Sequence, residues 1–375
     1  MSEGQSKVKP RTDGTWLRRV KDKIILWILA KLFGLFIAVM VSFPKRSRMS
    51  HNNGIAGVGW LKIVDNPEWP EHEFFQPGRK FPIRVRHASA TFLDDAMKCI
   101  RSISIKFADE RFKSPFDLEM NTGKFSLFWS ASSFYKFGKK RAEQYGIEYV
   151  DYNRVYPDGH KGAVESLRID PSSFQNLHYY AKTPYKFISE DGTLRYVKYR
   201  VLPADDAPET GIDENPSEWD TCNQRIDPYD TKGRNYLKYE WEDCVREGRA
   251  KYKLQIQLHD AEDYEDPEIF NNMVVWDEEE HPWMDLAYFE IERTLDWKES
   301  TMTTFSVKNM PKTLGVLPAQ SIYDYNSLNY FRTHSEIARH ARRLSYKFFG
   351  FPPEIPNNDL RNSSDWAKGK YSRYS

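Results

Sequence analysis

The sequence predicts an α+β fold: an antiparallel β-barrel of about eight strands, with helices inserted between the strands and at the C-terminal end. Three observations support this prediction. Segments with the period of two typical of half-buried strands recur between residues 55 and 293. Long insertions separate them, which favours an antiparallel barrel over a doubly wound parallel sheet. The 375 residues are 40% hydrophobic and 15% aromatic, which is enough for a large core.

The strands are predicted from the alternation of polar and apolar residues. It is strictest over 251–258, which reads KYKLQIQL, and over 102–107, which reads SISIKF. Weaker alternation predicts five further strands, over 55–64, 81–87, 125–129, 194–201 and 286–293.

Helices are expected in the gaps and near the C-terminus. Residues 131–144 and 163–182 are predicted helices, and 329–348 carries a helical pattern rich in arginine and histidine. The stretch 204–220 is acidic and contains proline but has no apolar period, which predicts an exposed loop.

An apolar run of about 20 residues, 24–43, is long enough to cross a bilayer and is interrupted only by Lys31. It predicts a membrane anchor or monotopic insertion; the alternative is a first helix buried against the domain. A cleaved secretory signal is disfavoured because Pro44-Lys45-Arg46 is not a small-residue cleavage site. We therefore expect a basic and apolar N-terminal segment over 1–44, one domain over 45–349, and a polar tail over 350–375.

Charge and cysteine usage limit the partners and the compartment. Lys and Arg number 55 and Asp and Glu 54, a formal charge of only +1, so nucleic acid is not an expected partner. Cys99, Cys222 and Cys244 lie far apart without Cys/His spacing, which disfavours disulfides and structural zinc. These features predict an intracellular, membrane-associated protein. Self-association is left open.

Several chemistry-bearing segments occur in a fixed order along the chain. His51 precedes a glycine-rich strand, and FPIRVRHA (81–88), RSISIKFAD (101–109) and DLEMNTGKFSLFW (117–129) follow. This ordered set resembles the haem-binding core of catalases, and more closely the catalase-related allene oxide synthases of corals. Segments 63–75, 254–259, 275–286 and 324–327 add to the resemblance, which extends from about residue 45 to 349.

The resemblance implies a haem b site and a role for each matching residue. His51 matches the distal histidine that exchanges a proton with a hydroperoxide, and Asn121 matches the amide that hydrogen-bonds the peroxide oxygens. Ser50 stands where the coral enzymes have threonine, so its hydroxyl is expected to orient His51.

Four arginines match cofactor-binding positions. Arg48, Arg86 and Arg343 match the arginines that pair with the haem propionates, a role suited to the guanidinium fork. Arg332 matches the arginine that keeps the iron-ligating tyrosine ionised.

The sequence departs from the family pattern at the iron ligand. The tyrosine expected four residues after Arg332 is replaced by Glu336, a weaker anionic oxygen donor. Glu336 is the metal-ligand candidate; the alternative is that Arg332 and Glu336 form an ordinary i,i+4 pair. Tyr346, His334 and His340 are less favoured ligands.

Three functions follow from these expectations. The first is haem-dependent conversion of polyunsaturated fatty-acid hydroperoxides, of the allene oxide synthase or hydroperoxide lyase type, with residues 24–43 placing the pocket near a membrane. The second is a haem-free protein that binds or isomerises an apolar, lipid-like ligand. Hydrogen peroxide dismutation is less favoured because of Ser50 and the missing tyrosine.

Overall fold

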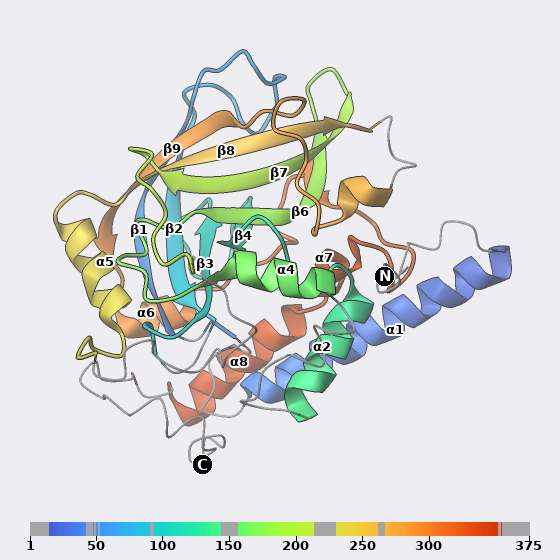
Figure 1. The fold of residues 1–375 in the computed structure, drawn as a ribbon, viewed down its shortest axis with the longest axis horizontal. Helices are drawn as coiled ribbons and strands as arrows, with labels where there is room; N and C mark the ends of the chain where they lie inside the picture. Colours follow the sequence, from blue (N-terminus) through green and yellow to red (C-terminus); the bar gives the residue numbers. More distant parts are fainter. Residues whose placement is uncertain are drawn as a thin grey trace.

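A closed antiparallel barrel of eight strands forms the centre of the molecule (Figure 1). The computed structural model describes residues 15–42, 48, 50–51, 53–90, 94–143, 157–213, 230–261, 267–351 and 354. The barrel strands, in the order in which they pair around the ring, are β1 (Asn53–Ile63), β2 (Lys80–Ser89), β3 (Cys99–Lys106), β4 (Asp117–Thr122), β6 (Tyr179–Ile188), β7 (Leu194–Pro203), β8 (Lys251–Asp260) and β9 (Met284–Thr294), which returns to β1. Two short strands, β5 (Leu167–Arg168) and β10 (Leu314–Val316), pair with β3 and β6.

The observed barrel confirms the predicted fold class, with two local errors in the strands. Residues 125–129 alternate like a strand but form none, and the strand of this region is β4. The chain turns away at Gly123, whose φ is +78° and where a Cβ would lie 2.3 Å from the Glu165 carbonyl oxygen. The second error is β6, which occupies part of the helix predicted over 163–182. A bulge between Ala181 and Tyr185 interrupts its alternation.

The barrel interior contains one histidine whose two ring nitrogens both have partners. His87 of β2 is fully buried, and its Nδ1 and Nε2 each lie 3.0 Å from a tyrosine hydroxyl, of Tyr179 and Tyr252 respectively. Tyr179 donates to the Phe174 carbonyl oxygen, and Trp241 donates to the Tyr252 hydroxyl. His87 therefore donates from Nδ1 and accepts at Nε2, the pattern of a neutral imidazole.

Helices pack outside the barrel. They are α1 (Trp16–Val41), α2 (Ala131–Glu143), α4 (Pro157–Ser166), α5 (Tyr236–Arg246), α6 (Trp297–Met302), α7 (Ser327–Arg332) and α8 (Glu336–Phe349), with a 3₁₀ turn, η2 (Pro267–Phe270). Helices α1 and α8 lie side by side below the barrel (Figure 1). The approach is close at Gly34, where a Cβ would lie 2.4 Å from the His334 carbonyl oxygen. The run 24–43 is thus helical from residue 24 to 41, with one side packed on the domain.

The predicted C-terminal helix is two helices. Helix α7 ends at Arg332 and α8 begins at Glu336, with a turn over 333–335. Counting by fours along one continuous helix therefore fails across this turn. In the predicted acidic loop, residues 204–213 form no helix and only the end of β7 precedes them, while 214–220 lie outside the described residues. Residues 1–14, most of the expected tail and Cys222 are likewise outside them.

Candidate functional site

A cavity of about 390 Å³ lies between the barrel and the helices below it. Strands β2 to β4 and β6, with the segment before β1, provide one wall, and α1, α2, α7, α8 and residues 304–305 provide the other. Its size lies within the range of about 300–1,000 Å³ that is usual for sites of small molecules and cofactors. Six of the eight predicted site residues line it: Arg48, Ser50, His51, Arg86, Asn121 and Arg332.

His51 lines this cavity in a constrained conformation just before β1. Its φ of +60° is uncommon for a residue other than glycine, and such conformations concentrate at functional sites. Ser50 Oγ lies 2.7 Å from His51 Nδ1, the contact that the sequence predicted, and Arg86 donates to the His51 carbonyl oxygen at 3.0 Å. The buried Nε2 has no hydrogen-bond partner in the described structure.

The electrostatic surroundings keep His51 neutral. Burial and the nearby charge of Arg86 together lower the pKa of its imidazole to about 4. At neutral pH the ring therefore has one proton. If Nδ1 donates it to Ser50, Nε2 is left as an acceptor that faces a polar ligand group.

Asn121 lies on β4 at the end of its pairing with β3 and β6. It stands opposite Ser102 on β3 and Tyr180 on β6, and all three residues line the cavity. Two further asparagines, Asn272 and Asn329, line the cavity with a buried amide atom that has no partner in the described structure. The cavity thus contains several polar groups that a ligand could satisfy.

Arginines gather around the cavity. Arg48 donates to the Thr303 carbonyl oxygen at 2.5 Å. Arg86 and Arg342 are 4% and 5% exposed. Burial lowers the pKa of Arg48, and repulsion from Arg86 and Arg342 adds to the shift. Arg342 was not predicted as a site residue; it occupies the place in the cavity that was expected of Arg343.

Arg343 and Glu336 lie outside the cavity. Arg343 stacks on Phe112 and bonds the His340 ring. Glu336 pairs with Lys308 and Arg339 at 3.3 Å each, and its side chain is 47% exposed. Partial burial alone would raise the pKa of Glu336, but the two cations lower it.

The helical phase explains these positions. Because the turn over 333–335 shifts α8, its cavity-facing residues are Ala338, Arg339 and Arg342, preceded by Ser335 in the turn. The alternative ligands Tyr346, His334 and His340 also do not line the cavity. The proposed Arg332–Glu336 pair is wrong, because Arg332 pairs with Glu119 instead.

The Arg332–Glu119 ion pair crosses the cavity. The Arg332 guanidinium, at the end of α7, lies 2.5 Å from the Glu119 carboxylate on β4. Burial by itself would raise the pKa of Glu119, but Arg332 lowers it, so the carboxylate is ionised at neutral pH. Sequence reasoning missed Glu119. Its position two residues before Asn121 on the same strand face could have indicated it.

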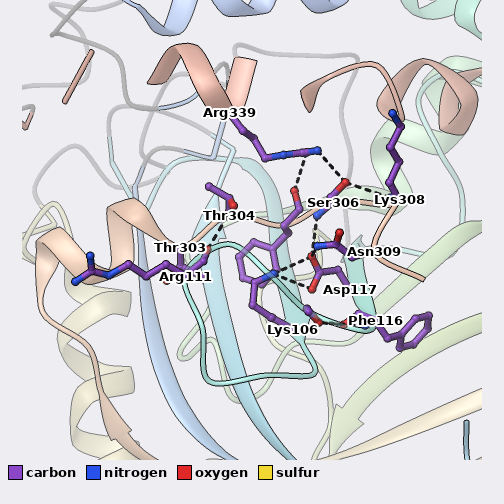
Figure 2. Close-up of polar contacts among 12 residues, drawn as sticks. Lys106, Arg111, Phe116, Asp117, Thr303, Thr304, Ser306, Lys308, Asn309 and Arg339 are labelled. Carbon is purple, nitrogen blue, oxygen red and sulfur yellow. Dashed lines mark hydrogen bonds and ion pairs between the residues drawn. The ribbon is translucent and has the colours of Figure 1, made fainter. Parts of the chain in front are cut away.

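A buried network positions the segment that carries Thr304 and Phe305 (Figure 2). Lys106 on β3 pairs with Asp117 on β4 at 2.9 Å, and both side chains are fully buried. Asp117 also accepts from the Ser306 backbone N–H and the Asn309 amide. Figure 2 shows Arg339 reaching the same segment, where it donates to the Phe305 carbonyl oxygen and to Ser306 Oγ. This network couples the barrel to α8.

The cavity fits a haem only in part. Arg48, Arg86 and Arg342 suit carboxylates such as propionates, and His51 suits the distal role. On the α8 side, however, Ser335 faces the cavity in place of a phenolate, and the Arg332–Glu119 pair crosses the space between β4 and the helices. In the part of the chain that the structure describes, no three His, Cys, Asp or Glu side chains gather into a metal site. None of the described residues of α7, α8 and the turn between them that line the cavity is a tyrosine, histidine, cysteine or carboxylate, so this side of the cavity does not fit an axially ligated haem.

Comparison with known proteins agrees with the fold. No family model matches the chain. The chain is 38% identical over 305 residues to the "Allene oxide synthase-lipoxygenase protein" of Plexaura homomalla, covering 79% of this chain and 28% of that protein. It is 26% identical over 272 residues to "Linolenate 9R-lipoxygenase" of a Nostoc species, covering 69% and 33% respectively. The chain thus spans about a third or less of the length of these relatives.

Solved catalases share the architecture. A bacterial catalase superposes with a TM-score of 0.61 at 15% identity, covering 83% of this chain and 60% of the catalase. A fungal catalase gives 0.56 at 15% identity, with coverages of 81% and 62%. These likenesses show the fold. Together with the similarity to the Plexaura protein, they show that the chain has the catalase-like fold and is similar to the aligned part of that allene oxide synthase-lipoxygenase protein.

Proposed function

We propose that this protein binds fatty-acid hydroperoxides in its cavity and acts on them through His51. The observation that carries the proposal is the His51 imidazole, whose buried Nε2 has no protein partner and whose Nδ1 contacts Ser50. Similarity to an allene oxide synthase-lipoxygenase protein and to a linolenate lipoxygenase supports fatty-acid chemistry.

The residues divide the task between them. A hydroperoxide O–H would donate to Nε2 of neutral His51, which can hold that proton and orient the peroxide group. The Asn121 amide would donate to the peroxide oxygens and hold them beside the imidazole. Ser50 would act on Nδ1 and fix the tautomer and the orientation of the ring.

The proposed function has two possible forms, which differ in whether haem takes part. In the first, haem b is the cofactor of an allene oxide synthase or hydroperoxide lyase, as the family resemblance implies. In the second, the protein is haem-free and binds or isomerises the oxidised lipid. The position of Ser335 and the Arg332–Glu119 pair favour the second form, so no step is assigned to haem.

The test uses the purified full-length protein, as isolated and after addition of one equivalent of hemin. Linoleic acid hydroperoxide is added, and binding, loss of conjugated-diene absorbance and product mass are measured. We expect saturable binding in both preparations and, if the haem-free form is correct, no need of hemin for any conversion. Absence of both binding and conversion would contradict the proposal.

We further propose that α1 attaches the protein to the surface of an intracellular membrane. One helix in the described chain, α1, is long and apolar enough to span a bilayer. Its buried residues form a stripe against α7 and α8, whereas large apolar side chains cover its other sides. The exposed ones in the apolar half are Ile24, Trp27, Ile28, Leu29, Leu32, Leu35, Phe36 and Val39.

The packing favours a helix that lies in the membrane interface rather than one that spans it. Spanning would detach α1 from α8 and open the cavity wall that Phe33, Ile37 and Val41 form. Basic residues 18, 19, 21 and 23 precede the apolar half and suit anionic headgroups.

Vesicle flotation tests this attachment. Full-length protein should float with vesicles of phosphatidylcholine and phosphatidylserine, and the double variant Leu32→Glu/Phe36→Glu should remain in solution. Tyr239→Glu on the exposed side of α5 is the matched control and should float like the wild type. Equal flotation of all three proteins would remove α1 from the contact.

A further inference from the structure

The walls of the cavity have a large excess of positive charge. Five arginines, at positions 48, 86, 332, 339 and 342, line it together with Lys182. Glu119 is the one carboxylate among the described residues that line it, and it pairs with Arg332. Guanidinium groups stay protonated in proteins, so the excess persists at every physiological pH. A cavity of this kind favours an anionic ligand.

Three of these arginines, Arg48, Arg86 and Arg342, line the cavity close enough to one another for their charges to repel. Burial lowers the pKa of Arg86, and repulsion from Arg342 lowers it further. Burial also lowers the pKa of Arg48, and repulsion from Arg86 and Arg342 adds to that shift. Arg86 also donates to the His51 carbonyl oxygen, which places this group next to the proposed reaction centre. Clustered buried cations are costly, and an anion with several acceptor oxygens offsets that cost.

Apolar side chains also line the cavity. Phe33, Ile37 and Val41 of α1 contribute to it, and Phe128 and Phe134 face it from the α2 side. The Phe33 and Phe134 rings lie 5.5 Å apart, edge to face, and the Phe128 and Phe134 rings 4.8 Å apart. The ligand must therefore have an acidic group and an apolar body.

We propose that Arg48, Arg86 and Arg342 bind the carboxylate of a long-chain fatty acid, whose hydrocarbon chain lies along the aromatic and aliphatic side chains of α1 and α2. This inference rests on the proposed function and names its recognition element. Haem propionates have the same chemistry. The ion pair across the cavity and Ser335 on the α8 side favour the flexible acid over the rigid porphyrin.

Lys106 and Asp117 contribute indirectly. Their pair fixes the segment whose Thr303 carbonyl oxygen accepts from Arg48. The same network holds Arg339 (Figure 2). The arginines are thus oriented by the barrel before a ligand arrives, which reduces the entropy lost on binding.

Displacement of a fluorescent long-chain acid, cis-parinaric acid, from the full-length protein tests the inference. The competitors are linoleic acid, methyl linoleate and hemin. Linoleic acid should bind at least about ten-fold more tightly than its ester, because the ester cannot accept charge-assisted hydrogen bonds as a carboxylate does. This comparison needs no variant, so it does not depend on whether a substituted chain folds.

Neighbouring arginines on α8 supply a matched pair of variants. Arg342→Gln should weaken the binding of linoleic acid roughly ten-fold and leave the affinity for methyl linoleate unchanged. Arg343→Gln, outside the cavity, should behave like the wild type. Circular dichroism and thermal unfolding confirm that each variant is folded.

The outcomes separate this inference from the proposed function. Equal affinity for acid and ester, or an Arg342→Gln protein that prefers the acid as strongly as the wild type does, overturns the carboxylate site and leaves the proposed function standing. Stoichiometric displacement by hemin with a ligated-haem spectrum assigns the arginines to propionates instead. Failure of linoleic acid, its ester and its hydroperoxide to bind at all contradicts the proposed function as well.

Discussion

Two histidines, His51 and His87, lie near the same end of the β1–β2 hairpin but differ in their hydrogen-bond partners. His87, inside the barrel, has a partner for each ring nitrogen and ordinary strand conformation. His51, before β1, has a φ of +60° and a buried Nε2 without a partner. Burial keeps both rings neutral, with a pKa of about 3 for His87 and about 4 for His51. Neutrality alone therefore does not mark a functional histidine; an unsatisfied nitrogen facing a cavity does.

The largest expected effect is on chemistry at His51. We expect His51→Ala to lower any hydroperoxide conversion by about 10²- to 10⁴-fold, the usual contribution of a positioned acid–base group. The melting temperature should stay close to that of the wild type, because removal of the ring leaves no polar group of the barrel without a hydrogen-bond partner. A steady-state assay and a thermal melt on the same preparation measure both quantities. Retained conversion would make His51 another structural histidine.

The next effect is on stability at His87. His87→Phe should lower the free energy of unfolding by about 2–4 kcal/mol, because two buried tyrosine hydroxyls lose a partner. Denaturant unfolding measures the change. Ligand binding per folded molecule should be unchanged, and a variant that is as stable as the wild type would show that the network contributes little.

The smallest effect, for each pH unit, is the pH dependence of stability that His87 contributes. The unfolded chain takes up protons near pH 6.5, whereas folded His87 resists protonation until about pH 3. The unfolded state therefore binds more protons in this window, and His87 lowers stability by about 1.4 kcal/mol for each pH unit on descent from pH 6.5. His87→Phe should remove this part of the slope. Conversion that depends on neutral His51 should persist until the pH approaches about 4.

The barrel half of the site could be predicted from sequence, because its residues lie on strands with strong local patterns. Arg86 and Asn121 follow from the resemblance of their ordered segments to the family, and the structure brings them together with Ser50 and His51. The helix half could not be predicted in the same way. Arg332, Glu336 and Arg343 were placed by their match to the family pattern; Arg332 lines the cavity, whereas Glu336 and Arg343, after the turn over 333–335, do not.

Tertiary contacts decide what the sequence pattern does not show. The turn after α7 packs against Gly34 of α1, some 300 residues away in the chain, and such a contact leaves no local periodicity. The sequence around Glu119 is that of an ordinary strand, and only the structure shows the ion pair between Glu119 and Arg332. The β6 strand was missed because its bulge, which contains Pro184, breaks the alternation.

The most direct test of this account is an absorption titration of the full-length protein and of Glu336→Tyr with hemin. Because side chain 336 points away from the cavity, we predict that neither protein forms an axially ligated haem and that the tyrosine variant gains no phenolate-to-iron charge-transfer band. One ligated haem per wild-type chain, or a phenolate spectrum in Glu336→Tyr, would contradict the account.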